Sequence, residues 1–122
     1  MTIKKVAVIG SGVMGSGIAA HCANAGCEVL LLDIVLEGKE DRNYLSNSAI
    51  TNIQKSNPEM LMHKSYINRI RTGNVEDDIS KLSNVDWVIE VIIEDLDSKK
   101  ILYSNIAEYL GPETILSSNT ST

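Results

Sequence analysis

Blocks of apolar residues alternate with polar ones along the first third of the chain. Residues 3–9 form a short run rich in β-branched side chains that stops at Gly10, and residues 28–33 form a second apolar run that closes on an acid. Between them, the alanine-rich residues 12–25 predict a helix that ends before Gly26. This succession predicts a βαβ unit, and strands that are apolar almost throughout are typical of a parallel sheet covered on both faces.

The middle of the chain is more polar and has helical spacing. Apolar residues four positions apart predict a helix over 41–56. Asn57 and Pro58 are residue types that favour the start of a new helix, which we place over 58–70. Because such a pair of helices is longer than an ordinary crossover, we expect a helical hairpin that projects from the sheet.

The second half of the chain repeats the alternation of strand and helix. We predict a short strand over 70–75, a buried strand over 85–93, a helix that ends at Gly111, and a last strand that begins at 114–116. The chain is therefore predicted to be an α/β protein with a mostly parallel sheet and helices on both faces.

The turn after the first strand carries the clearest chemical signal. Its sequence is G-x-G-x-x-G, directly after a predicted strand and at the start of a predicted helix. In that context the first glycine permits a tight turn, the second lets the backbone approach a pyrophosphate, and the third lets helix and strand pack closely, while the helix N-terminus favours an anion. The pattern predicts a dinucleotide site in a Rossmann-type fold. Its candidate cofactor-binding residues are Gly10, Ser11, Gly12, Val13, Met14 and Gly15.

Asp33 narrows the choice of dinucleotide. It closes the second strand 18 residues after Gly15, where a carboxylate hydrogen-bonds the hydroxyls of the adenosine ribose. The same carboxylate would repel a 2′-phosphate, and the next residues, Ile34 and Val35, offer no group to bind one. We therefore predict NAD rather than NADP. FAD is bound by a similar fingerprint, and the motif alone leaves it open.

Composition restricts the remaining classes of function. The 122 residues are 43% hydrophobic and 22% charged, which is typical of a globular domain, and the net charge of −5 argues against binding nucleic acid through its phosphates. The apolar runs are too short to span a membrane and no signal peptide precedes the first strand, so we expect a cytoplasmic protein. Two cysteines, Cys22 and Cys27, without further ligands at suitable spacing, predict reduced thiols and no metal site.

Four blocks of sequence together resemble the L-3-hydroxyacyl-CoA dehydrogenase family. They are VAVIGSGVMGSGIA at 6–19, GNVEDD at 73–78, DWVIE at 86–90 and LSSNTS at 116–121. These blocks cover essentially the whole chain in the order that the family has. The resemblance implies that residues 1–122 form an NAD-binding Rossmann domain.

The resemblance also implies roles at the carboxyl ends of the last two strands. Glu94 and Lys99 match positions that contact NAD, and Ser121 matches the serine that hydrogen-bonds the reacting oxygen of the substrate. The position of Glu94 at a strand end favours a ligand contact independently of the family. The cofactor contacts implied beyond the glycine loop and Asp33 are Ile92, Ile93, Glu94, Lys99, Asn119 and Ser121.

The family reaction is the reversible oxidation of an L-3-hydroxyacyl-CoA to the 3-oxoacyl-CoA, with the hydride passing to NAD+. In the family a histidine oriented by a glutamate removes the hydroxyl proton, and both follow the block that ends here at Ser121. A helical domain that closes the acyl-CoA site and forms most of the dimer interface also follows it. We therefore expect a fold that is incomplete at the C-terminus, without that domain, and an isolated chain that is inactive. His21 and His63 are not expected to replace the missing base.

Three interpretations remain open at this stage. The chain is the NAD-binding part of a 3-hydroxyacyl-CoA dehydrogenase, or a stand-alone module that binds NAD or a partner without catalysis, or one half of an enzyme whose C-terminal half is encoded separately. A sheet edge and apolar surface next to the absent domain also predict self-association into a homo-oligomer.

Overall fold

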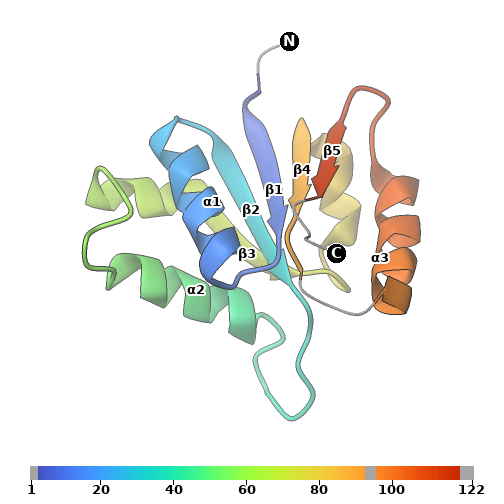
Figure 1. Cartoon of the computed structure of the whole chain (residues 1–122), viewed down its shortest axis with the longest axis horizontal. Helices are drawn as coiled ribbons and strands as arrows, with labels where there is room; N and C mark the ends of the chain where they lie inside the picture. Colours follow the sequence, from blue (N-terminus) through green and yellow to red (C-terminus); the bar gives the residue numbers. More distant parts are fainter. Residues whose placement is uncertain (1–2, 93–95, 119–122) are drawn as a thin grey trace.

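One parallel sheet organises the chain. The computed structural model describes residues 3–92 and 96–118, and in this part the strands run in the order β3-β2-β1-β4-β5 with every neighbouring pair parallel (Figure 1). The strands are β1 (Lys5–Ile9), β2 (Glu28–Asp33), β3 (Ile70–Asn74), β4 (Trp87–Glu90) and β5 (Ile115–Ser118). The α/β class and the parallel sheet that the sequence predicts are confirmed.

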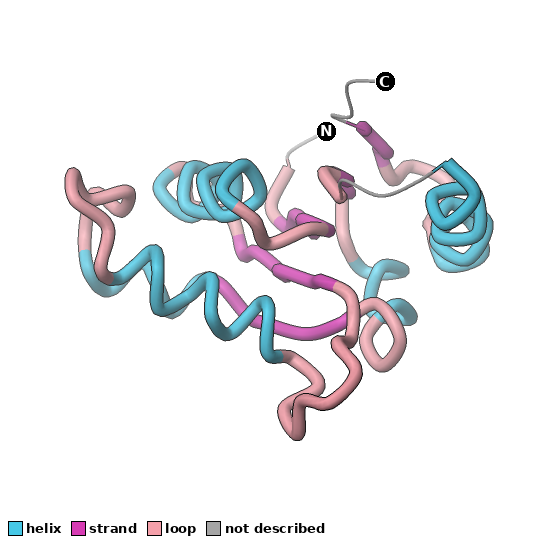
Figure 2. Tube along the Cα trace, turned by 60° about the horizontal axis from the view of Figure 1, so that its bottom comes forward, coloured by secondary structure: helices cyan, strands magenta, loops and turns pink. Residues whose placement is uncertain are grey.

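Helices cover both faces of this sheet, and β1 shows why. Its residues alternate between the two faces, so Val6 and Val8 pack in one apolar cluster while Ala7 and Ile9 pack in the other. The first cluster includes the small residues of α1 (Val13–Asn24) and the inner side of α2 (Tyr44–Gln54). The second includes Ile106 of α3 (Leu96–Tyr109) and residues of η2, a 3-10 helix (Ile79–Asn84). Figure 2 shows the helices on the two sides of the strands.

The predicted hairpin does not project from the sheet. Ala49 and Ile53 of α2 are 1% and 2% exposed and pack in the same cluster as Val29 and Ile70. Ser46 of α2, also buried, donates a hydrogen bond of 2.9 Å to the carbonyl oxygen of Gly73 in β3. The expectation of a projecting hairpin is therefore wrong, because one side of α2 is covered by the sheet.

The second helix predicted over 58–70 is also wrong. Bends follow Pro58, and only Lys64–Arg69 form a short 3-10 helix, η1, before β3 begins. The side chain of Asn24 in α1 binds the carbonyl oxygen of Met60 at 3.0 Å and the N–H of Met62 at 2.9 Å. Such side-chain bonds compete with helix formation because they occupy the main-chain groups that a helix would pair.

The strand predicted over 85–93 is present but shorter, as β4. Just before it, the carboxylate of Asp86 accepts hydrogen bonds of 2.9 and 3.0 Å from the N–H groups of Lys4 and Lys5, and these bonds lower the pKa of Asp86. After Glu90 the chain leaves the strand, although the N–H of Val91 still donates to the carbonyl oxygen of Ile9 at 2.8 Å. No helix in the described residues is both long and apolar enough to cross a membrane.

Candidate functional site

The glycine-rich turn lies at the carboxyl end of β1, the point at which the order of the strands in the sheet reverses. From β1 the chain continues to β2 on one side, and it returns through β3 to β4 on the other side. Gly10 has a φ of +115°, a conformation that L side chains rarely adopt. Its N–H donates to the carbonyl oxygen of Leu32 at 2.7 Å, so the turn is held against the end of β2. Open α/β sheets bind ligands at such a switch point.

The three glycines of the motif meet different surroundings. A Cβ on Gly15 would lie 1.6 Å from the carbonyl oxygen of Gly10, so the first turn of α1 packs on the preceding turn at a distance that only glycine permits. A Cβ on Gly10 would lie 3.0 Å from Cγ2 of Val91. A Cβ on Gly12 would meet no atom of the described residues within 4 Å, and the φ of Gly12, −68°, suits any residue. The packing within the described part of the chain therefore explains Gly10 and Gly15 but not Gly12.

The first turn of α1 faces outward with apolar side chains. Gly12 is the N-cap and supplies no side-chain hydrogen bond to the helix N-terminus. Val13 and Met14 follow it with 90% and 53% of their surface exposed. A helix N-terminus beside exposed apolar side chains suits a ligand that carries both an anion and an apolar ring.

Asp33 joins the glycine turn to the end of β2. Its Oδ2 accepts hydrogen bonds from the N–H of Ser11 at 2.7 Å and from the hydroxyl of Ser11 at 2.6 Å, and its Oδ1 accepts from the N–H of Ile34 at 2.7 Å. Ser16 in turn donates to the carbonyl oxygen of Ser11 at 3.0 Å. Because a carboxylate has about four lone-pair sites, Asp33 retains capacity to accept a ribose hydroxyl.

Arg42, the first arginine after Asp33 in the sequence, is engaged elsewhere. Its Nε and Nη2 donate to the two oxygens of Asp77 at 2.7 and 3.0 Å, and Glu76 lies 3.6 Å from Nη2. The hydrogen bond from Arg42 and a second from Asn74 lower the pKa of Asp77. A 2′-phosphate near Asp33 would therefore meet a carboxylate, while this arginine is held by acids.

Glu90 is a residue that the sequence reasoning gave no role. It is the last residue of β4 and is fully buried, and its Oε2 accepts a hydrogen bond from the N–H of Ile92. Its Oε1 accepts from the hydroxyl of Tyr103 at 2.8 Å and from that of Ser118 at 3.2 Å. The signal that could have identified it is an acid inside the apolar run VIEVII.

The other predicted site residues are only partly described. Ile92 is buried in the core, 7% exposed. Lys99 lies within α3, but its side chain is outside the described part. Ile93, Glu94, Asn119 and Ser121 also lie outside the described residues. Their cofactor and substrate contacts remain predictions.

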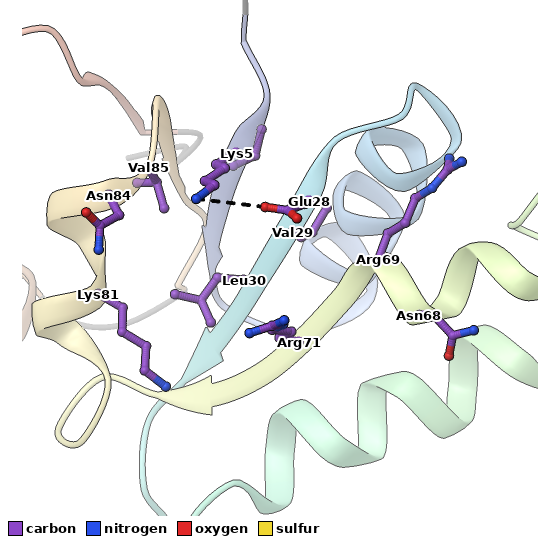
Figure 3. A pocket seen from close by; sticks show the side chains of 11 residues that line it. Lys5, Glu28, Val29, Leu30, Asn68, Arg69, Arg71, Lys81, Asn84 and Val85 are labelled. Carbon is purple, nitrogen blue, oxygen red and sulfur yellow. Dashed lines mark ion pairs between the residues drawn. The ribbon is translucent and has the colours of Figure 1, made fainter.

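A hollow of about 460 Å³ lies over one face of β1, β2 and β3, mostly toward the amino-terminal halves of these strands (Figure 3). Of the four basic side chains that line it, three are already engaged. Lys5 faces Glu28 at 4.0 Å, Lys81 pairs with Asp78 at 2.7 Å, and the guanidinium of Arg69 stacks on an aromatic ring. The hollow is therefore a weaker candidate for an anionic ligand than the carboxyl edge.

The two cysteines take no part in either region. Both are free thiols that are half-buried, Cys22 in α1 and Cys27 just before β2. Burial raises the pKa of the Cys22 thiol, and the neighbouring Cys27 adds to the effect. A thiol with a raised pKa is a poor nucleophile.

The fold and the turn together define a Rossmann-type dinucleotide-binding domain. Comparison with known proteins gives its family: residues 5–122 match the model of the 3-hydroxyacyl-CoA dehydrogenase NAD binding domain. The chain belongs to this family, and its cofactor is NAD.

The relatives are considerably longer than this chain. A "Probable 3-hydroxyacyl-CoA dehydrogenase" of Deinococcus radiodurans is 50% identical over 121 residues, which are 99% of this chain and 35% of the relative. A Rickettsia felis protein whose name describes a trifunctional enzyme of a fatty acid oxidation complex is 48% identical over 98% of this chain and 17% of its own length. The crystal structure of 3-hydroxybutyryl-CoA dehydrogenase from Escherichia coli superposes with a TM-score of 0.78 at 35% identity, over 100% of this chain and 25% of that one. The chain thus spans about a third or less of these proteins.

The different surroundings of the glycines predict different effects of alanine. Gly15→Ala clashes with a main-chain oxygen, so the variant is expected to unfold or to lose several kcal/mol of unfolding free energy, roughly 3 or more. Gly12→Ala is expected to cost under about 1 kcal/mol, because alanine is a poorer N-cap, and yet to weaken NAD+ binding at least about tenfold by placing a methyl group where the pyrophosphate approaches.

Gly17→Ala is the matched control for Gly12→Ala. A Cβ on Gly17 also meets no described atom within 4 Å, but Gly17 lies inside α1. This variant should keep or raise the melting temperature and bind NAD+ as the unaltered chain does. Thermal melts and calorimetric titrations check all three variants. Equal NAD+ affinity of Gly12→Ala and Gly17→Ala would contradict the role of Gly12.

Proposed function

We propose that the chain supplies the NAD half-site of an enzyme that interconverts an L-3-hydroxyacyl-CoA and its 3-oxoacyl-CoA. The main support is Gly12, the N-cap of α1, where a Cβ would meet no atom of the described residues within 4 Å. A ligand that approaches the backbone there accounts for it. The names of the relatives, which refer to 3-hydroxyacyl-CoA and 3-hydroxybutyryl-CoA, support the class of substrate.

Two regions of the chain bind different parts of the dinucleotide, one the adenosine and pyrophosphate and the other the nicotinamide. The N-terminus of α1 holds the pyrophosphate through its main-chain N–H groups, and Asp33 accepts hydrogen bonds from the adenosine ribose. Ile92, Ile93, Glu94, Lys99 and Asn119 border the nicotinamide end, and Ser121 hydrogen-bonds the reacting oxygen of the substrate. When bound, NAD+ accepts a hydride from the carbon that bears the hydroxyl group.

Removal of the hydroxyl proton needs a base, and neither histidine of the chain lies at the carboxyl edge of the described sheet. His21 lies exposed in the last turn of α1, away from its N-terminal end. His63 caps η1, where its Nδ1 lies 2.7 Å from the hydroxyl of Ser65. Neither is near the glycine turn. We therefore propose that the isolated chain binds NAD+ but does not catalyse the reaction alone.

The role of Asp33 predicts the preference between the two dinucleotides. The unaltered chain is expected to bind NAD+ at least about tenfold more tightly than NADP+, since a carboxylate repels the 2′-phosphate. Asp33→Asn is expected to reduce this preference by about five- to tenfold, mainly by weakening NAD+ binding. Isothermal titration with both dinucleotides measures each value.

Asp86→Asn is the matched control for Asp33→Asn. Asp86 also accepts two hydrogen bonds from main-chain N–H groups, but at the amino end of the strands. Its substitution should lower the stability and leave the NAD+ to NADP+ ratio unchanged. If both variants change the ratio equally, or if the unaltered chain binds neither dinucleotide, the proposed function is wrong.

The positions of the two histidines, away from the glycine turn, predict the outcome of an activity assay. The pure 122-residue chain with NAD+ and an L-3-hydroxyacyl-CoA is expected to produce no NADH above background. A full-length 3-hydroxyacyl-CoA dehydrogenase serves as the positive control. NADH formation that depends on the thioester, and that is lost in Gly12→Ala, would contradict the proposal that the chain alone is inactive.

A further inference from the structure

Glu90 combines complete burial with an ionisable side chain. It is 0% exposed, and a carboxylate removed from water is costly unless hydrogen bonds stabilise it. Three of its partners are the N–H of Ile92, the hydroxyl of Tyr103 and the hydroxyl of Ser118. Burial raises the pKa of Tyr103 above its ordinary value of 10.0, and the bond to Glu90 adds to this while Ser118 opposes it. The phenol is therefore protonated at neutral pH and can donate.

These partners come from three different elements at one edge of the sheet. Ile92 follows the end of β4, Ser118 ends β5, and Tyr103 lies in α3. In the sheet register Glu90 stands between Ile9, the last residue before the glycine turn, and Ser118. One carboxylate thus connects the carboxyl ends of two strands to the helix between them, beside the switch point.

Stability alone does not account for an acid at this position. The strand residues before it, Val88 and Ile89, are buried by apolar packing, and a buried ionic group is often no more stabilising than an apolar residue of similar volume. Unlike an apolar side chain, a hydrogen-bonded acid fixes the direction of each group that donates a hydrogen bond to it. The donors to Glu90 include the N–H of Ile92 and the hydroxyl of Ser118, so Glu90 fixes the position of the main chain after β4 and of the end of β5.

We propose that Glu90 is a positioning residue for the nicotinamide end of the cofactor site. It acts through Ile92 and Ser118 and does not itself touch the reacting atoms. The inference rests on the proposed function, which places the nicotinamide at the carboxyl ends of β4 and β5. The adenosine end is held by a separate set of bonds, from Gly10 to Leu32 and from Ser11 to Asp33, none of which involves Glu90.

This separation gives a test that a merely structural role would not pass. ADP-ribose contains the adenosine and pyrophosphate parts of NAD+ but no nicotinamide. Glu90→Gln and Tyr103→Phe are expected to weaken NAD+ binding by about five- to tenfold while the affinity for ADP-ribose stays within about twofold. Isothermal titration of each variant with both ligands measures the ratio of the two affinities.

Tyr109→Phe is the matched control. Tyr109 lies on the same helix, at its end and 37% exposed, and its substitution should change neither affinity. Tyr103→Phe removes a single oxygen atom, so it keeps the test valid if Glu90→Gln fails to fold.

Three outcomes would overturn the inference. Equal weakening of NAD+ and ADP-ribose binding would show that Glu90 supports the whole fold, and unchanged NAD+ binding in both variants would show that it positions nothing. If the unaltered chain binds ADP-ribose as tightly as NAD+, no nicotinamide site exists for Glu90 to position. An unaltered chain that binds neither ligand would instead show that the proposed function itself is wrong.

Discussion

The contact between the first turn of α1 and the carbonyl oxygen of Gly10 is the constraint on which the nucleotide site depends. With no Cβ at Gly15, the helix begins directly on the turn that ends β1, and any larger residue would separate the two. This close approach places the N-terminus of α1 at the carboxyl edge of the sheet. The bond from Gly10 to Leu32 and the bond from Val91 to Ile9 then hold the same turn between β2 and β4.

Three carboxylates show how position in a parallel sheet decides what an acid does. Asp86, at the amino end of the strands, binds two main-chain N–H groups and belongs to the framework. Asp33 also binds main-chain N–H groups, but it lies beside the helix N-terminus, where a ribose hydroxyl can reach a remaining lone pair. Glu90 lies at the same edge as Asp33 but is enclosed, so its oxygens accept hydrogen bonds from the protein's own donors. Similar chemistry thus gives Asp86 a structural role, and it supports the binding role that we propose for Asp33 and the positioning role that we propose for Glu90.

The parts of the fold that local sequence determines were predictable. Gly10, Gly26 and Asp33 mark the ends of β1, α1 and β2, and the structure confirms these elements within a few residues. The segment after Pro58 was not predictable, because Asn24, distant in sequence, takes up the main-chain groups that a helix would have paired.

The candidate site follows the same division. The glycine turn and Asp33 both lie within the first βαβ unit, so their spacing in the sequence was enough to indicate them. The hydrogen bonds of Glu90 come from Tyr103 and Ser118, residues that only the folded chain brings to it. The roles of Glu94 and Ser121 stay predictions, because these residues lie outside the described part.

Mapping the amide chemical shifts of the 15N-labelled chain during titration with NAD+ tests the central claim most directly. The largest changes are predicted at Gly12, Gly15 and Ile34, around the glycine turn and the end of β2, with a second group at Ile92. The amides of Lys5 and Arg71, at the hollow on the amino-terminal side, should not move. Changes confined to that hollow, or no change at millimolar NAD+, would contradict the account.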